Sequence, residues 1–332
     1  MKKAQATADK QRSSPESFKC ETLRFEDVSE MSEMFRGRAD VRFIQKAPGK
    51  VTATTRFTSI GPFQIQQVSW TGKLIVEAGT NDNMTSLVIP APQKRPAFIS
   101  GEYLNASDCM LYGASSSHFA DISDRSGGMQ LFLPIGTLEH AIAARLQDDP
   151  INLESTRRPL NPGFGSLQTL RNLVVELTNM MDIESKEEIE TLCQQSLIKK
   201  VVDRISETLC RDRLLASGSH DEHAPSRCLL SEVRDIFEES GREPVYLYEL
   251  CQQLGVSART LQITFKQAYG ISPMRYLKLR RLHAARERRF TTSVEDVSIK
   301  KAALENGFID RSRFADDFKK LFGQLPSQTP KA

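Results

Sequence analysis

The chain has 332 residues, with 45 Lys+Arg against 42 Asp+Glu, and 39% of its residues are hydrophobic. This length predicts two or three domains, and the composition excludes a wholly disordered chain. No stretch of the sequence approaches the roughly 20 apolar residues that a membrane-spanning helix needs. Residues 1–17 lack the apolar core of a secretory signal, and the six cysteines form no C-x-x-C pair. These features favour a cytoplasmic protein with neither a zinc site nor a disulfide framework.

The first half of the chain has the pattern of a small β domain. Residues 1–20 are polar and predict a flexible tail. From about residue 25 to 134, short alternating or apolar runs are separated by turn-forming residues such as Gly61-Pro62. This spacing predicts a small antiparallel β-barrel or a sandwich, and an enclosed barrel of this size can hold one small ligand. Five large aromatic residues there either line such a pocket or form plain core: Phe43, Phe57, Phe63, Trp70 and Phe98.

After Pro134 the hydrophobic period becomes helical. Helices are predicted over 136–146, 166–181 and 185–215, and the second carries leucines and valines at i, i+3, i+4 and i+7 spacing. The last two helices either close the barrel or pair across a dimer. Residues 21–215 are therefore expected to form one α+β domain, and the small polar residues of 216–228 are expected to form a linker.

Positive charge is concentrated in the C-terminal part, which is predicted to be an all-helical domain over residues 229–330. Residues 229–332 hold 18 Lys+Arg and 13 Asp+Glu, and residues 256–289 hold nine basic residues and one acid. Such a block is typical either of a surface that faces phosphates or of a solvated helix face.

Residues 245–268 have the pattern of a helix–turn–helix. Gly255 supplies the tight turn, and Ser257 is a good N-cap for the second helix. The inward stripe of that helix is Leu261, Phe265 and Ala268, whereas its opposite face carries Arg259, Gln262, Ile263 and Lys266. An exposed row of donors and acceptors on a second helix is what readout of the major groove requires.

The same pattern returns about 50 residues later. A helix over 297–306, a turn at Gly307 and an N-cap at Asp310 precede a helix over 311–322. That helix is expected to bury three phenylalanines and a leucine and to expose Ser312, Arg313, Asp316, Lys319 and Lys320. A basic helix over 272–289 separates the two units, and a single chain can thereby span two major grooves about 34 Å apart.

These residues resemble the DNA-binding domain of the AraC family of bacterial transcription regulators. The resemblance covers residues 230–330, and its first half rests on Leu250, Ser257–Leu261, Phe265-Lys266, Gly270–Pro273, Tyr276-Leu277, Arg281-Leu282 and Ala285-Arg286. Its second half rests on Gly307-Phe308, Asp310, Ser312–Phe314, Phe318-Lys319, Phe322-Gly323 and Pro326. The Arg-Thr-Leu-Gln run at 259–262 resembles the ethanolamine-utilisation branch of the family.

The resemblance implies a regulator that activates transcription beside RNA polymerase. It also implies that residues 21–215 are a sensor and dimerisation domain, with a cupin-like barrel followed by helices, which binds an effector and forms a homodimer. One departure is Asp316-Asp317 in the second recognition helix, where basic or neutral residues are commoner. Two acids near phosphates weaken binding, so the first unit is expected to do most of the sequence reading.

We assign base contacts to Arg259, Gln262, Ile263, Ser312, Arg313 and Asp316, and phosphate contacts to Lys266, Lys278, Lys319 and Lys320. No catalytic, metal or cofactor site is assigned, and ligand-binding residues remain open. His220 and His223 lie in the linker, His118 is expected in a turn at the rim of the barrel, and Cys109 is expected to be a buried small hydrophobe. The alternatives are a ligand-independent regulator whose barrel only dimerises, and, more distantly, a cupin-like enzyme fused to a DNA-binding domain.

Overall fold

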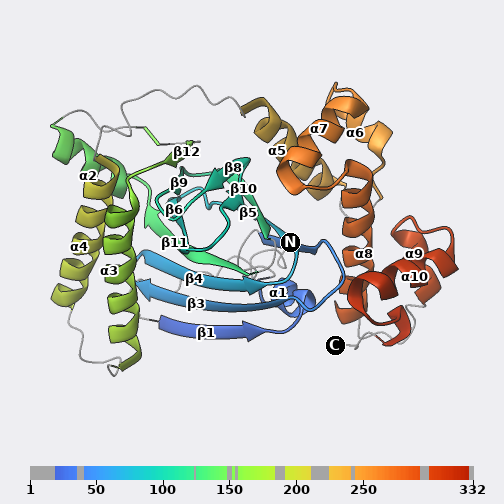
Figure 1. Cartoon of the computed structure of the whole chain (residues 1–332), viewed down its shortest axis with the longest axis horizontal. Helices are drawn as coiled ribbons and strands as arrows, with labels where there is room; N and C mark the ends of the chain where they lie inside the picture. Colours follow the sequence, from blue (N-terminus) through green and yellow to red (C-terminus); the bar gives the residue numbers. More distant parts are fainter. Residues whose placement is uncertain are drawn as a thin grey trace, which may run out of the picture.

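The computed structural model of the chain describes residues 19–35, 41–122, 125–147, 152–153, 156–183, 191–210, 224–240, 244–291 and 299–328. Most of the predicted tail and the greater part of the predicted linker lie outside these residues. A β-rich domain occupies the first half of the chain, and a group of helices formed by the C-terminal part lies against one side of it (Figure 1).

The larger of the two β-sheets has seven antiparallel strands in the order β1-β3-β4-β11-β6-β9-β12. Its central hairpin pairs Ile60 with Phe63 across a turn in which Gly61 adopts a left-handed φ of 55°. The bounds are β1 (Lys19–Phe25), β3 (Thr52–Ile60), β4 (Phe63–Thr71), β6 (Met84–Pro90), β9 (Cys109–Tyr112), β11 (Ser126–Pro134) and β12 (Arg157–Leu160).

A second sheet of five antiparallel strands has the order β2-β5-β10-β7-β8. Its strands are β2 (Val41–Gln45), β5 (Leu74–Gly79), β7 (Ala97–Ile99), β8 (Glu102–Leu104) and β10 (Ser117–Ile122). The predicted β domain is confirmed, but the described strands form two separate sheets instead of a closed barrel. The edge strands of one sheet, β1 and β12, pair only within that sheet, and helix α1 (Val28–Phe35) lies between β1 and β2 along the chain.

Three helices cover the outer face of the seven-stranded sheet: α2 (Thr137–Leu146), α3 (Phe164–Ile183) and α4 (Thr191–Cys210) (Figure 1). Their leucines share one apolar cluster with the outward-facing residues of β4, β6 and β11, such as Ile65, Leu87 and Leu131. This cluster fits the predicted amphipathic pattern, because the stripe over 166–181 is what lies on the sheet.

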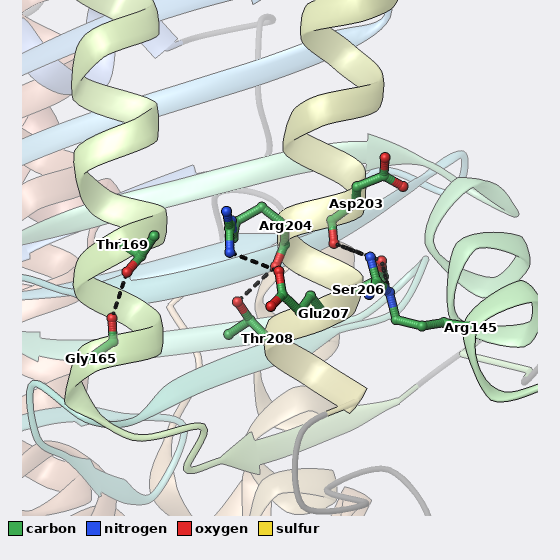
Figure 2. Close-up of polar contacts among 8 residues, drawn as sticks. All are labelled: Arg145, Gly165, Thr169, Asp203, Arg204, Ser206, Glu207 and Thr208. Atoms are coloured by element: carbon green, nitrogen blue, oxygen red, sulfur yellow. Dashed lines mark hydrogen bonds and ion pairs between the residues drawn. The ribbon is translucent and has the colours of Figure 1, made fainter.

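Polar contacts hold α2 against α4 at the edge of this layer (Figure 2). The Arg145 guanidinium donates to Ser206 Oγ at 3.2 Å and to the Asp203 carbonyl at 3.0 Å. Within α4, Arg204 pairs with Glu207 at 2.7 Å, and in α3 the Thr169 hydroxyl donates to the Gly165 carbonyl. The apolar faces of α3 and α4 pack on the seven-stranded sheet, but the described strands form no closed barrel for these helices to close.

The elements found among the described residues of the C-terminal part are all helices. They are α5 (Ala224–Glu239), α6 (Leu247–Gln253), α7 (Ala258–Tyr269), α8 (Pro273–Thr291), α9 (Ile299–Glu305), α10 (Arg311–Phe322) and a short 3-10 helix, η2 (Pro326–Gln328). Helix α5 begins at Ala224, so helical structure starts within the segment expected to be linker. Among the described residues, none of the helices combines the length and the apolar character needed to cross a membrane.

Candidate DNA-binding surface and ligand cavity

Helices α6 and α7 form the first helix–turn–helix unit. Gly255 makes the turn between them with a φ of 61°, a conformation that favours glycine. The Ser257 hydroxyl then caps α7 by accepting a hydrogen bond from the Thr260 amide at 3.0 Å. The inner stripe predicted for α7 is buried, with Leu261 and Phe265 completely inaccessible.

The outer face of α7 carries the side chains to which base and phosphate contacts are assigned. Arg259, Gln262 and Lys266 are exposed, and Ile263 is 47% exposed although it is a large apolar residue. Lys266 Nζ lies 3.2 Å from the Gly270 carbonyl at the C-terminal end of the helix. Opposite a buried stripe, this exposed row has the geometry that a helix lying in the major groove requires.

Helices α9 and α10 form the second unit on the same plan. Asp310 caps α10 by accepting hydrogen bonds from the amides of Ser312 at 2.9 Å and Arg313 at 3.1 Å. Phe314, Phe318 and Leu321 are buried, and four of the assigned residues stand exposed on the other side: Arg313, Asp316, Lys319 and Lys320. Ser312 is exposed as well, at the first turn of the helix.

An ion pair links the second recognition helix to α8. Lys278 Nζ lies 2.5 Å from Asp317 Oδ2, and the two side chains are 41% and 22% exposed. The structure therefore gives one of the two unusual acids of α10 a structural partner. It also places Lys278, to which the sequence analysis assigns a phosphate contact, in an ion pair within the protein.

Several arginines of the basic helix α8 contact other parts of the protein. Arg275 donates to the Lys46 carbonyl at 3.1 Å, and Arg281 donates to the Val245 carbonyl at 2.8 Å. Arg286 contacts Asp27 Oδ2 at 2.6 Å and lies over the Phe322 ring. The charge block is thus neither a plain phosphate surface nor a plain solvated face, because several of its arginines bind the other domain or the neighbouring helices.

A buried carboxylate on the five-stranded sheet is the centre of the contact between the two domains. Glu77 of β5 is 4% exposed, and its Oε1 accepts hydrogen bonds from the hydroxyls of Tyr269 at 2.9 Å and Tyr276 at 2.6 Å. Arg280 lies 3.5 Å from Glu77 Oε2 and stacks on the Phe237 ring. Burial and the Glu77 charge raise the pKa values of both tyrosines, so both remain protonated donors.

Residues next to Glu77 extend the contact in both directions. Ile44, Ile75 and Phe119 share an apolar cluster with the core of α7 and α8. The backbone amide of Gln45 donates to His283 Nε2 at 2.9 Å, and the side-chain Nε2 of Gln45 donates to the Leu321 carbonyl at 3.1 Å. The contact therefore combines apolar surface with hydrogen bonds that fix its geometry.

A cavity of about 990 Å³ lies between the two sheets. Its walls include Phe35 of α1, Phe43 of β2 and Trp70 of β4, together with Val76 of β5 and Ala120 of β10. The volume is at the upper end of the range typical of small-molecule sites. Four of the five aromatic residues singled out in the sequence line this cavity, whereas Phe63 packs under the helices of the other cluster.

The five-stranded sheet separates this cavity from the C-terminal helices. Alternate residues of β5 point to opposite sides, so Val76 and Ala78 line the cavity while Ile75 and Glu77 contact the helical domain. On β10, Ala120 and Ile122 line the cavity while Phe119 contacts Tyr269. One layer of backbone thus stands between a ligand-sized space and the helix–turn–helix domain.

The structure gives different outcomes for the four residues that the sequence analysis considered apart from the DNA-binding set. His220 and His223 lie outside the described residues. Cys109 is buried as expected, and burial raises the pKa of its thiol. The turn at the barrel rim expected for His118 is wrong, because this residue lies on strand β10 and lines the cavity between the sheets. Among the described residues, no group of three or more His, Cys, Asp or Glu side chains is arranged to hold a metal ion.

Comparison with known proteins identifies the C-terminal part. Residues 250–332 match the family described as a helix-turn-helix domain. The probable thc operon regulatory protein of Rhodococcus erythropolis is 32% identical over 122 residues, covering 35% of this chain and 37% of that protein. The XylDLEGF operon transcriptional activator 2 of Pseudomonas putida is 27% identical over 139 residues, covering 42% of this chain and 85% of that protein.

Two further proteins are similar to this chain. The transcriptional activator RhaS of Citrobacter koseri is 30% identical over 166 residues, covering 48% of this chain and 53% of that protein. The solved structure of the AraC-like transcriptional activator CuxR matches with a TM-score of 0.41 at 13% identity, over 86% of this chain and all of that one. This chain thus spans only about a third to a half of the thc regulator and of RhaS.

The match over residues 250–332 confirms the helix–turn–helix domain that the sequence predicted in the C-terminal part. The finer resemblance to the ethanolamine-utilisation branch stays a prediction. Sequence reasoning missed the contact between the domains. Its one visible signal was Glu77, a lone acid that ends the apolar run of residues 74–77.

Proposed function

We propose that the chain is a sequence-specific DNA-binding transcription regulator that responds to an effector and activates its target promoters. The observation that carries this proposal is the exposed row on α7, with Arg259, Gln262, Ile263 and Lys266 opposite a fully buried stripe. The domain type and the regulators that the chain resembles support the same function. Like them, it acts by binding double-stranded DNA, with no chemical reaction of its own.

The two recognition helices would lie in adjacent major grooves on one face of the duplex. Arg259 and Arg313 would pair with guanine edges and Gln262 with adenine, while Ile263 contacts a thymine methyl group and Asp316 accepts from a cytosine amino group. Ser312 is assigned to a base edge, and the phosphate contacts are assigned to Lys266, Lys278, Lys319 and Lys320.

The effector site in this proposal is the cavity between the sheets. A ligand there would press on Val76 and Ala120, whose strand neighbours Glu77 and Phe119 contact the helical domain directly. It can shift the regulator only by binding one arrangement of the domains more tightly than another. Homodimerisation through the N-terminal domain, contact with RNA polymerase, and a place in the cytoplasm on the nucleoid belong to the same proposal.

The experiment is chromatin footprinting of the tagged full chain, followed by band-shift titration of the shared motif at two salt concentrations. We expect discrete peaks with two half-sites about one helical turn apart. Diffuse binding without a motif, at any salt concentration, would overturn sequence-specific regulation. The variant Ala120→Phe places a large side chain in the cavity. The alternative, a ligand-independent regulator, predicts that this variant gives the same footprint as the unchanged chain.

A further inference from the structure

The five-stranded sheet forms the floor of the cavity, and it carries an aromatic ring, Phe43, and a hydrogen-bonding group, His118, on strands two positions apart. Strand registers set Val41, Ala78 and His118 in one row across the five-stranded sheet, and Phe43, Val76 and Ala120 in the next. Rows on one face of a sheet are about 7 Å apart, and neighbouring strands are about 4.8 Å apart. The small side chains of Ala78 and Ala120 leave open the middle of the floor, between the Phe43 ring and the His118 imidazole.

One end of the cavity is built from aromatic rings. The Phe43 centroid lies 5.5 Å from that of Phe35 and 5.6 Å from that of Trp70, and Phe35 lies 5.7 Å from Phe57. All four residues line the cavity. Such walls favour a compact apolar or aromatic body, which gains the burial of its surface without needing polar partners.

The charged groups along the cavity are acids. Glu21, Asp82 and Asp121 line it, and the described lining residues include no Lys or Arg. Lys46 is paired with Asp121, and Arg157, the cation that acts on His118, donates to Ser117 Oγ at 3.1 Å. A carboxylate entering this space would lose its hydration without gaining a counter-charge.

His118 supplies an uncharged hydrogen-bonding group. Its Nδ1 is buried and makes no hydrogen bond, while its ring stacks on Tyr112 at a centroid distance of 4.7 Å. Burial and the Arg157 charge lower its pKa to about 4, so the imidazole is neutral at physiological pH and has one donor and one acceptor nitrogen. A hydroxyl or an amide on a ligand can hydrogen-bond such a group, whereas a neutral imidazole offers an anion no compensating positive charge.

We propose that the cavity takes an uncharged molecule with a compact apolar or aromatic body and one hydroxyl or amide that hydrogen-bonds His118, and that it rejects carboxylates. This inference rests on the proposed function only in naming the cavity as the effector site. It specifies the chemical class of effector and makes His118 the residue that orients it.

Trp70 is the single tryptophan of the chain and lines the cavity, so its fluorescence reports occupancy. The probes are 1-adamantanol, 1-adamantanecarboxylate and 1-adamantanamine, which share one optically transparent body and differ in charge. Titrated into the full chain at pH 7.5, the alcohol is expected to bind at least about tenfold more tightly than the carboxylate. Equal or tighter binding of the carboxylate or the amine would overturn the proposal, as would the lack of any Trp70 response.

Three variants assign the effect to residues. His118→Phe keeps the ring and is expected to weaken the alcohol about three- to tenfold, whereas His140→Phe, at an exposed histidine, changes nothing. Gln66→Lys places a cation on a half-buried lining position and is expected to strengthen carboxylate binding. An unchanged preference in both His118→Phe and Gln66→Lys contradicts the assignment. DNA binding by the same proteins, measured without probe, tests the regulator function separately from the ligand class.

Discussion

The first helix–turn–helix unit is built into the contact between the two domains, whereas the second is held to the β domain mainly through α8. In the first unit Tyr269, the last residue of α7, reaches Glu77 on the sheet. In the second, the backbone carbonyl of Leu321 accepts a hydrogen bond from Gln45 on the sheet. In Figure 1, α7 accordingly lies beside the five-stranded sheet, and α9 and α10 lie beyond α8.

This difference gives the two units different tasks. A change in the five-stranded sheet reaches the first recognition helix through the buried Tyr269 side chain. It reaches the second through α8, the Lys278–Asp317 pair and one hydrogen bond from Gln45 to a backbone carbonyl of α10. In the proposed regulator, the first unit would therefore be both the main reader of the DNA sequence and the part that senses the β domain. The second unit would add a further DNA contact through a more acidic helix.

The largest expected effect comes from removing one buried ring from the core of each helix–turn–helix unit and comparing the two variants. Phe265→Ala and Phe318→Ala each remove a completely buried ring, and each is expected to lower the free energy of unfolding by about 3–5 kcal/mol. Only Phe265 packs on Tyr269 and Tyr276, at 5.5 and 5.1 Å. Hydrogen exchange should therefore rise in β5 and β10 with Phe265→Ala alone. Equal exchange in the two variants would contradict the unequal coupling.

The next effect concerns the buried carboxylate. Glu77→Gln removes the buried carboxylate that pairs with Arg280, whose side chain is 13% exposed, and is expected to weaken the contact between the domains by about 2–5 kcal/mol. Hydrogen exchange in α8 and small-angle scattering of the full chain measure the loss. The matched control is Glu26→Gln, which removes an exposed carboxylate paired with Lys50. A variant that behaves like this control would show that Glu77 does not hold the domains together.

Sequence patterns predicted the parts of this structure whose reasons are local. The caps Ser257 and Asp310 and the buried stripes of α7 and α10 could be read from residue spacing, because a helix has one period and one set of end signals. The pairing of Glu77 with two tyrosines about 190 residues away in sequence could not, because no local rule links a strand to a helix of another domain. The same holds for His118, which only the strand register places in the cavity wall.

A smaller effect compares the two readers. Arg259→Ala is expected to cost about 1–3 kcal/mol of operator binding and to relax specificity at one base pair. Arg313→Ala is expected to cost less, because Asp316 and Asp317 follow it on the same helix. Binding selection from a randomised operator, run with each variant, measures both quantities. Equal losses would mean that the two units read the site alike, and a loss that is uniform over all sequences would remove Arg259 from the base-reading set.

The anchoring of the second unit should depend on pH. His283 accepts from the Gln45 amide and lies against the Phe322 ring at 5.1 Å, and burial together with Arg286 lowers its pKa to about 3. Because the unfolded chain binds this proton below about pH 6.5 and the folded chain does not, stability falls as the pH drops from 6.5 towards 3. The loss is at most about 1.4 kcal/mol per pH unit.

His283→Asn should remove this part of the slope in thermal unfolding. The slope from His118, whose pKa is also lowered, should remain in that variant because its cavity is unchanged. An undiminished pH dependence in His283→Asn would show that the histidine is not buried in its neutral form at the contact.

The smallest effect tests whether Lys278 serves the protein or the DNA. The Lys278–Asp317 pair is partly exposed, and pairs of this kind contribute up to about 1 kcal/mol to stability. Asp317→Asn should therefore change stability little, but it frees a cation beside the second recognition helix and should strengthen DNA binding at low salt with a steeper salt dependence. Lys278→Gln should flatten that dependence equally at specific and nonspecific sites. If Asp317→Asn leaves the salt slope unchanged while Lys278→Gln lowers it, Lys278 already contacts phosphate in the complex, and the ion pair of the free protein breaks when DNA binds.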